Sequence, residues 1–221
     1  MNKITPTQPL LIMLYGFPGS GKSYVARQLA DQLKAAHVQG ERIRNELFNN
    51  PQFDRSENDV ITKLMNYMSE EFLGSGVSVI YDTNALRASQ RHTLRELARH
   101  HKAQPIVIWL QIDTESAFMR TQRRDRRKAD DKYSFPIERK TFDNILGNMQ
   151  NPTNAEDYVV LSGKHIFTTQ LSAILKKLND MNLLRLDDVS SGLAMPELVN
   201  LVPNPAAGRV DLNRRRNIVI R

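Results

Sequence analysis

Short runs of consecutive apolar residues alternate along the chain with longer segments in which apolar residues recur every three or four positions. The runs are typical of strands buried on both faces of a sheet, and the periodic segments are typical of amphipathic helices. The sequence predicts strands at residues 10–15, 37–39, 77–81, 105–111 and 158–161. It predicts helices at residues 22–36, 41–48, 56–73, 89–101, 114–128, 136–150 and 167–179. This alternation favours an α/β fold, a three-layer sandwich with a mainly parallel sheet covered by helices on both faces.

The alternating pattern fades after about residue 186, where Ser, Pro and Gly interrupt short apolar clusters. We therefore expect one domain over residues 1–186, with a helical lid at about 120–135, and a C-terminal extension with a basic tail over 187–221. A chain of 221 residues is long enough for one such domain to bury its own core.

No part of the sequence indicates a membrane-spanning or secreted protein. The apolar runs are much shorter than the roughly 20 residues that a spanning helix needs. The N-terminus lacks the basic start and the longer apolar stretch of a signal peptide. The chain has no cysteine, which excludes disulfides and thiolate metal sites. We expect a soluble, cytoplasmic protein.

A glycine-rich segment with the sequence Gly-Phe-Pro-Gly-Ser-Gly-Lys-Ser occupies residues 16–23, between the first predicted strand and the first predicted helix. Glycines let backbone N–H groups turn inward around a phosphate, and the N-terminus of the following helix also favours an anion. In such a loop Lys22 reaches the phosphate oxygens and the Ser23 hydroxyl ligates Mg²⁺. We predict that ATP binds here with Mg²⁺. The predicted nucleotide-binding residues are Gly16, Pro18, Gly19, Ser20, Gly21, Lys22, Ser23 and Tyr24.

Switch proteins, motors and small-molecule kinases share this loop, so other residues must distinguish between them. Glu41 and Arg44 follow the short second predicted strand at a spacing of one helical turn. The Glu41 carboxylate could accept the proton of an acceptor hydroxyl, and Arg44 could hold a phosphate or carboxylate of the acceptor. The alternative is an ordinary ion pair on the surface of a helix.

A second candidate carboxylate ends the apolar strand at residues 77–81. Asp82 could support Mg²⁺, directly or through water, or orient the acceptor. The alternative is a turn or a helix N-cap, because Asp82-Thr83-Asn84 is also favourable turn chemistry.

The positive charge of the chain lies in two places. Residues 120–132 and residues 208–221 each carry a net charge of +4, whereas the whole chain carries +7. On a helix over 114–128, Arg120, Arg124 and Arg127 would share one face, and a lid could close such arginines over the phosphates. The alternatives are a solvated charged face and, for the tail around residues 214–216, a disordered segment. Both patches suit an anionic partner such as nucleic acid.

The motifs together resemble the kinase domain of phage-type polynucleotide 5′-hydroxyl kinases, over roughly residues 9–180. These kinases belong to a wider set of P-loop (AAA-type, ATP-binding) kinases that includes zeta-toxin-like sugar-nucleotide kinases. The resemblance rests on the order and approximate spacing of residues 16–23, Glu41-x-x-Arg44, Asp82-Thr83-Asn84 and Arg120-x-x-x-Arg124. The Asp-Thr-Asn triplet and the paired arginines are more specific than the phosphate-binding loop.

The resemblance implies roles for individual residues on the acceptor side. Glu41 matches the general base that activates the hydroxyl, and Arg44 matches the residue that holds the acceptor's phosphate. Asp82 matches an active-site carboxylate that is also a candidate metal ligand. Arg120 and Arg124 match the lid arginines, of which Arg124 is the one expected to contact the transition state. The chain departs from the family at Glu41, because the family's base is usually an Asp, which is one methylene shorter.

Three functions are compatible with these residues. The first is an ATP-dependent kinase acting on a polynucleotide 5′-hydroxyl, with the basic lid and tail binding nucleic acid. The second is a kinase of a small molecule such as a sugar nucleotide, a nucleoside or an antibiotic. The third is a nucleotide-dependent binding or switch protein without a phosphoryl acceptor.

Overall fold

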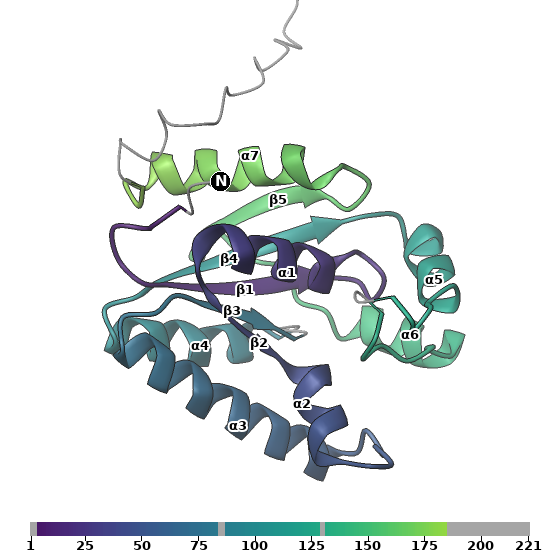
Figure 1. Ribbon diagram of the computed structural model, residues 1–221. Coiled ribbons are helices and arrows are strands. Elements are labelled where there is room, and N and C mark those ends of the chain that lie inside the picture. The colour runs from purple at the N-terminus through teal and green to yellow at the C-terminus, as the bar shows by residue number, and fades with distance from the viewer. Residues whose placement is uncertain (1–3, 84–86, 129–130, 185–221) are drawn as a thin grey trace, which may run out of the picture.

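The structure is a computed structural model that describes residues 4–83, 87–128 and 131–184. Strands and helices alternate along this part of the chain, as Figure 1 shows. The strands are β1 (Leu10–Gly16), β2 (Ala36–Gln39), β3 (Val79–Asp82), β4 (Gln104–Gln111) and β5 (Tyr158–Ser162). The helices are α1 (Lys22–Leu33), α2 (Gly40–Leu47), α3 (Arg55–Gly74), α4 (Ala88–His100), α5 (Thr114–Gln122), α6 (Arg139–Gly147) and α7 (Phe167–Asp180).

The five strands form one sheet in the order β2-β3-β1-β4-β5, and every pair of neighbours is parallel. Helices α1 and α7 cover one face of the sheet, and α3 and α4 cover the other (Figure 1). This arrangement confirms the predicted α/β sandwich with a parallel sheet.

Strand β1 shows why the chain adopts this fold. Its side chains alternate between the two faces of the sheet, so that Leu10, Ile12 and Leu14 pack with α1 and α7. Leu11 and Met13 pack with α3 and α4 on the opposite face. Because both faces are covered, the strand is apolar at nearly every position, which is the pattern that the sequence displays.

The carboxyl ends of all five strands lie at the same edge of the sheet. The loops that follow them therefore gather there. The chain passes from β1 to β2 on one side of β1, and later crosses from β3 to β4 on its other side, so the strand order reverses at β1. A crevice at such a reversal of strand order is the usual ligand site of an open α/β sheet. The glycine-rich loop follows β1, Asp82 ends β3 and α2 follows β2 directly.

Three helices, α1, α5 and α6, have a boundary that differs from the predicted one by more than one residue. Helix α1 ends at Leu33 because Lys34 adopts a left-handed conformation with φ of 49°. Helix α6 begins at Arg139, three residues after Pro136, instead of at the proline.

The prediction of a helix to residue 128 was wrong, because α5 ends at Gln122. After Gln122, some backbone N–H groups donate hydrogen bonds to Asp side chains instead of to backbone carbonyl oxygens one helical turn earlier. The Asp125 carboxylate accepts a hydrogen bond from the Arg127 backbone N–H at 3.1 Å, and the Asp131 carboxylate accepts one from the Asp125 N–H at 3.1 Å. Such local bonds compete with helical ones. Arg120, Arg124 and Arg127 therefore do not share a helix face.

Parts of the predicted organisation lie outside the described residues. These are the extension at 187–221 with its arginines at 214–216, and Asn84 of the Asp-Thr-Asn triplet. Within the described ranges, no helix combines the length and the apolar character that crossing a membrane requires.

Candidate active site

The loop between β1 and α1 is shaped by glycines that no other residue could replace without strain. Gly16 has φ of 144°, and a Cβ atom there would lie 2.4 Å from the Leu110 carbonyl oxygen. Gly19 has φ of 83°, and a Cβ atom there would lie 2.2 Å from the Ala117 carbonyl oxygen. Both positions combine a left-handed backbone with a close approach to a neighbouring chain segment, which only glycine tolerates. The loop therefore has the conformation that a phosphate cradle needs.

Lys22, the first residue of α1, folds back over this loop. Its ammonium donates hydrogen bonds to the carbonyl oxygens of Gly16 at 2.9 Å and Phe17 at 2.8 Å. Desolvation by the surrounding protein lowers the pKa of Lys22 to about 8, against the opposing effect of the nearby Asp82 carboxylate, and Arg124 adds to the lowering. A phosphate that binds next to Lys22 would raise this pKa again, because the anion stabilises the charged ammonium.

Ser23 and Asp82 meet beside the loop, although 59 residues separate them in the sequence. The Ser23 hydroxyl donates a hydrogen bond of 3.2 Å to Oδ1 of Asp82, whose side chain is only 4% exposed. A hydroxyl and a carboxylate are hard oxygen ligands, and Mg²⁺ usually completes such a pair with water and phosphate oxygens. The two side chains fit a Mg²⁺ that arrives with a nucleotide. Among the described residues, no group of three or more His, Asp or Glu side chains is arranged so that it could hold a metal ion in the absence of a nucleotide.

No motif in the sequence singles out His37, yet its ring lies beside Asp82, the hydrogen-bond partner of Ser23. The residue belongs to β2, and its Nε2 atom lies 3.0 Å from Oδ2 of Asp82. A lone histidine on a four-residue strand carries no pattern, and the contact exists only because β2 pairs with β3.

The remaining predicted nucleotide-binding residues lie in or next to the loop. Pro18 and Ser20 are buried, and the Ser20 hydroxyl has no hydrogen-bond partner among the described residues. Tyr24 is 39% exposed and packs edge-on against Phe167 of α7, with ring centroids 6.3 Å apart. Tyr24 thus lies on the α7 side of α1.

Glu41 and Arg44 lie on the first turns of α2 and differ in their surroundings. The Glu41 side chain is 47% exposed, and desolvation raises the pKa of its carboxyl although Arg44 and Arg124 act in the opposite direction. The Arg44 guanidinium is buried, with Nη1 donating to Oε2 of Glu57 at 2.8 Å and Nη2 donating to Oδ1 of Asn58 at 2.6 Å. Its Nε atom lies 3.6 Å from Oε2 of Glu41. Arg44 thus joins α2 to the start of α3, and its role toward an acceptor stays a prediction.

The two lid arginines point to different places. The exposed Arg120 on α5 donates a hydrogen bond of 2.9 Å to the Gly163 carbonyl oxygen, in the loop after β5. Arg124 donates one of 2.6 Å to the Phe135 carbonyl oxygen. Desolvation lowers the pKa of Arg124, and the Asp131 and Glu41 carboxylates oppose this effect. Arg124 is therefore the arginine that lies within electrostatic reach of both Glu41 and Lys22.

The chain after α5, which we call the lid segment (residues 123–128 and 131–135), contacts the α2 side of the site. The Phe135 and Phe53 rings meet edge-on, with centroids 5.1 Å apart. The Arg126 guanidinium stacks 4.9 Å from the Phe135 ring centroid and lies 3.5 Å from Oδ1 of Asn45, one turn after Glu41 on α2. These contacts connect the lid segment to α2 and to the loop before α3.

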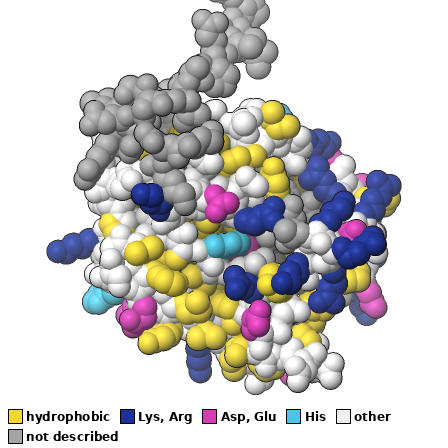
Figure 2. Space-filling view, in the orientation of Figure 1, with side chains coloured by type: hydrophobic (Ala, Val, Ile, Leu, Met, Phe, Trp, Pro, Cys, Tyr) yellow, Lys and Arg dark blue, Asp and Glu magenta, His cyan; other side chains and the backbone are white. Residues whose placement is uncertain are grey.

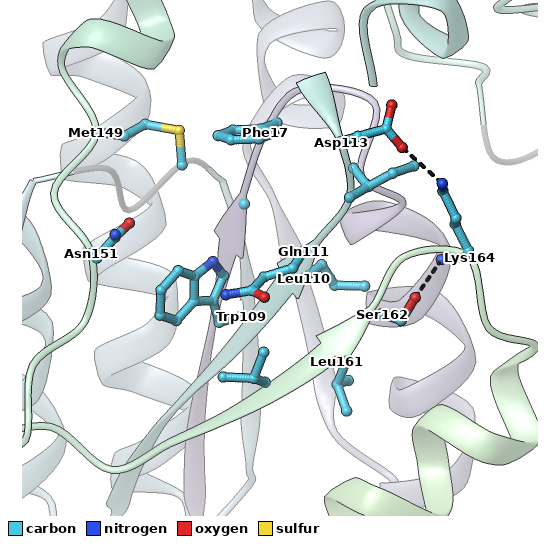
Figure 3. Close-up of a pocket in the computed structure, with 13 residues that line it drawn as sticks. Phe17, Trp109, Leu110, Gln111, Asp113, Met149, Asn151, Leu161, Ser162 and Lys164 are labelled. Carbon is cyan, nitrogen blue, oxygen red and sulfur yellow. Dashed lines mark hydrogen bonds and ion pairs between the residues drawn. The ribbon is translucent and has the colours of Figure 1, made fainter. Parts of the chain in front are cut away.

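A hollow of about 580 Å³ lies on the other side of β1, at the carboxyl ends of β4 and β5 (Figure 3). Phe17, Met149 and Trp109 form its apolar wall, and the ion pair between Lys164 and Asp113, 2.8 Å long, lies at its rim. Neither Glu41 nor Asp82 contributes to this hollow. Glu41 and Asp82 therefore lie on the β2 and β3 side of the loop, away from the hollow, whereas Arg120 reaches the loop after β5.

Comparisons with known proteins agree with this geometry. The family model of the AAA domain matches residues 11–152, and the chain therefore belongs to this family. No curated protein sequence is significantly similar to the chain.

Several solved structures share the fold. A putative kinase from Chloroflexus aurantiacus aligns with a TM-score of 0.62 and 15% identity, over 79% of this chain and 98% of that chain. A gluconokinase from Sinorhizobium meliloti aligns with a TM-score of 0.56 and 20% identity, over 79% and 94% of the two chains. The APS kinase of Mycobacterium tuberculosis, solved with AMPPNP and APS, aligns with a TM-score of 0.56 and 17% identity, over 79% and 99%. The chain thus has the fold of P-loop kinases, which agrees with the expected class of ATP-dependent phosphotransferase.

Proposed function

We propose that this protein is an ATP-dependent kinase that transfers the γ-phosphoryl group to a hydroxyl group of a small molecule. The observation that carries the proposal is that Arg124 lies within electrostatic reach of both Glu41 and Lys22, which belong to two other segments of the chain. Each of the three has a pKa displaced by desolvation. A carboxyl and a lysine that share the field of one arginine supply the groups that phosphoryl transfer needs.

In this proposal the loop amides and Lys22 bind the phosphates of ATP, and Ser23 and Asp82 hold Mg²⁺. When bound, Mg²⁺ neutralises part of the phosphate charge. Glu41 orients the acceptor hydroxyl and takes its proton on a carboxylate oxygen while the acceptor oxygen bonds to the γ-phosphorus. The bond between that phosphorus and ADP breaks, and Arg124 stabilises the negative charge on the transferred group. The raised pKa of Glu41 makes it a better base at neutral pH than an ordinary glutamate.

Two observations support a small acceptor over a polynucleotide. The edge-on pair of Phe53 and Phe135 and the approach of Arg126 to Asn45 join the lid segment to α2 and to the loop before α3, beside Glu41. A nucleic-acid strand whose 5′ end reacts at Glu41 needs an open path by which the rest of the strand leaves the site, and these contacts narrow the space for one. The gluconokinase and the APS kinase are, by their names, kinases of small molecules, whereas no comparison supports a polynucleotide 5′-hydroxyl acceptor.

The charge of the lid segment indicates the kind of small molecule. Arg and Lys side chains crowd one side of the molecule, the side on which α5 and α6 lie in Figure 1 (Figure 2). Arg126 belongs to the lid segment and lies about one helical turn of α2 beyond Glu41. An acceptor with a carboxylate or phosphate near its reacting hydroxyl would satisfy both Glu41 and Arg126.

The test is a transfer assay with γ-labelled ATP and Mg²⁺. The acceptors are sugar acids, sugar nucleotides, nucleosides and aminoglycosides, and 5′-hydroxyl DNA and RNA oligonucleotides are assayed in parallel. We expect label on a small molecule and none on the oligonucleotides, and strongly slowed transfer by a Glu41→Gln variant. Label on the oligonucleotides alone would replace this proposal with the polynucleotide kinase. ATP binding without transfer to any acceptor would favour a nucleotide-dependent switch.

A further inference from the structure

His37 makes a contact that the pairing of β2 with β3 does not require. The backbones of the two strands already pair over four residues each, with His37 opposite Ile80 and Gln39 opposite Asp82. The His37 ring reaches diagonally along the sheet, to the residue two positions beyond its own partner. It ends 3.0 Å from Oδ2 of Asp82, at the edge of the sheet where the glycine-rich loop lies.

The two oxygens of Asp82 have separate partners. Oδ1 accepts a hydrogen bond from the Ser23 hydroxyl at 3.2 Å, and Oδ2 faces Nε2 of His37 at 3.0 Å. Among the described residues the Asp82 carboxylate has no other hydrogen-bond partner, and its side chain is 4% exposed. A buried carboxylate oxygen without a donor would be costly, and the carboxylate would be free to rotate away from Ser23.

We propose that His37 is a positioning residue for Mg²⁺ binding: its Nε2–H group holds Oδ2 of Asp82 so that Oδ1 faces Ser23 and the metal. This inference rests on the nucleotide site of the proposed function but on no particular acceptor. A hydrogen bond from a neighbouring residue commonly fixes the orientation of a carboxylate that binds a metal, and losing it weakens metal binding by about 10- to 100-fold.

The arrangement also explains why a histidine suits this position. The His37 side chain is 21% exposed, so the ring fills the space between β2 and Asp82 while one edge stays near solvent. A serine on this strand would be too short to reach across two residues, and a lysine would bring a second charge next to Lys22. An imidazole places one N–H donor at a fixed distance from the backbone.

The experiment measures nucleotide binding, not catalysis. Calorimetric titration with AMPPNP, once with Mg²⁺ and once with EDTA, gives the factor by which Mg²⁺ increases affinity. We expect His37→Leu to reduce this factor by about tenfold or more and to leave the affinity in EDTA nearly unchanged. His37→Gln, whose amide places an N–H near the position of Nε2, should keep most of the factor. His92→Leu, a change of an exposed histidine on α4, is the matched control.

Three results would overturn the inference. His37→Leu could keep the full effect of Mg²⁺, it could weaken binding equally in EDTA, or His37→Gln could lose as much as His37→Leu. Circular dichroism of each variant confirms that it is folded. If only His37→Leu unfolds, the test is the factor by which Mg²⁺ increases affinity in His37→Gln, compared with the wild type. Because no acceptor is present, a failure of the kinase proposal in the transfer assay leaves this result unaffected, and the reverse also holds.

Discussion

The proposed phosphate end and the proposed acceptor end of the site are built in different ways. At the phosphate end, Ser23 lies in the first turn of α1 and Asp82 ends β3, so regular elements of the core place both side chains. At the acceptor end, Glu41 lies in the first turn of the short helix α2, and Arg124 lies outside any helix and donates a hydrogen bond to the Phe135 carbonyl oxygen. Core elements thus preorganise the phosphate end, whereas contacts between surface segments create the acceptor end.

The largest expected effect comes from the side chain that joins the two ends. We predict that Arg124→Ala lowers kcat by about 10³-fold, because an arginine that stabilises the transferred phosphoryl group contributes on that scale. ATP affinity should change little, since Lys22 and the loop remain. Steady-state kinetics and equilibrium nucleotide binding measure the two quantities.

The matched control for this prediction is Arg127→Ala. Arg127 is exposed and pairs with Asp125 at 2.9 Å, so its removal should leave kcat nearly unchanged. Equal losses in the two variants would mean that the general positive charge of the lid segment matters and that no single arginine does.

The next effect isolates the acceptor end. We predict that Glu41→Gln lowers kcat by about 10²- to 10³-fold without changing the dissociation constant of ATP, since the amide cannot accept the hydroxyl proton. Single-turnover transfer to the acceptor found in the labelling assay measures this loss. Glu46→Gln, a change of an exposed carboxyl on the same helix, should have no effect. A weakened affinity for ATP in Glu41→Gln would place Glu41 at the phosphate end instead.

The third effect isolates the phosphate end through pH. The pKa of Lys22 is lowered to about 8, and bound phosphates favour its charged form. The contribution of Lys22 to the affinity for ATP without Mg²⁺ should therefore be constant well below pH 8 and fall by about tenfold for each pH unit above it, because the free protein loses the proton that the complex needs. Near pH 8, calorimetry in buffers of different ionisation enthalpy should detect proton uptake on binding.

Lys22→Arg is the control for the pH effect. A guanidinium stays charged across this range, so the variant should show a flat pH profile even if its affinity is lower. A profile that falls equally in both proteins would show that another group titrates.

The smallest kinetic effect is expected at Arg44. This residue lies on the same helix as Glu41, but its guanidinium is buried like a core side chain. Because Arg44 pairs with the buried Glu57, Arg44→Met should lower the thermal midpoint by several degrees and change the acceptor KM only modestly. Arg42→Met, a change of an exposed residue on α2, is the control. A large rise in the acceptor KM with no change in the thermal midpoint would instead support the role that the family resemblance implies for Arg44.

Residues whose environment is local could be predicted from the sequence. Glycine spacing between an apolar strand and a helix identified the phosphate-binding loop at 16–23. The end of an apolar run located Asp82 at the edge of the sheet, and the alternation of strands and helices gave the fold class. In each case the residue's own strand, helix or turn displays the pattern, so the nearby sequence contains the information.

Residues whose environment is distant could not be predicted in this way. The partner of Arg44 is Glu57, on a different helix, so the spacing of Glu41 and Arg44 said nothing about burial of the guanidinium. A helical periodicity put three arginines on one face, but the bonds of Asp125 and Asp131 to the backbone end the helix before two of them.

Local patterns in the chain thus suffice to predict a P-loop α/β fold and a site for a nucleotide. They do not predict that Arg124 lies within electrostatic reach of both Glu41 and Lys22, that the lid segment contacts α2, or that His37 meets Asp82. The difference lies in the range of the interactions. The patterns of strands, helices and turns depend on neighbours in the sequence, whereas the site also depends on groups that only the folded chain brings together, such as His37 and Asp82, which are 45 residues apart.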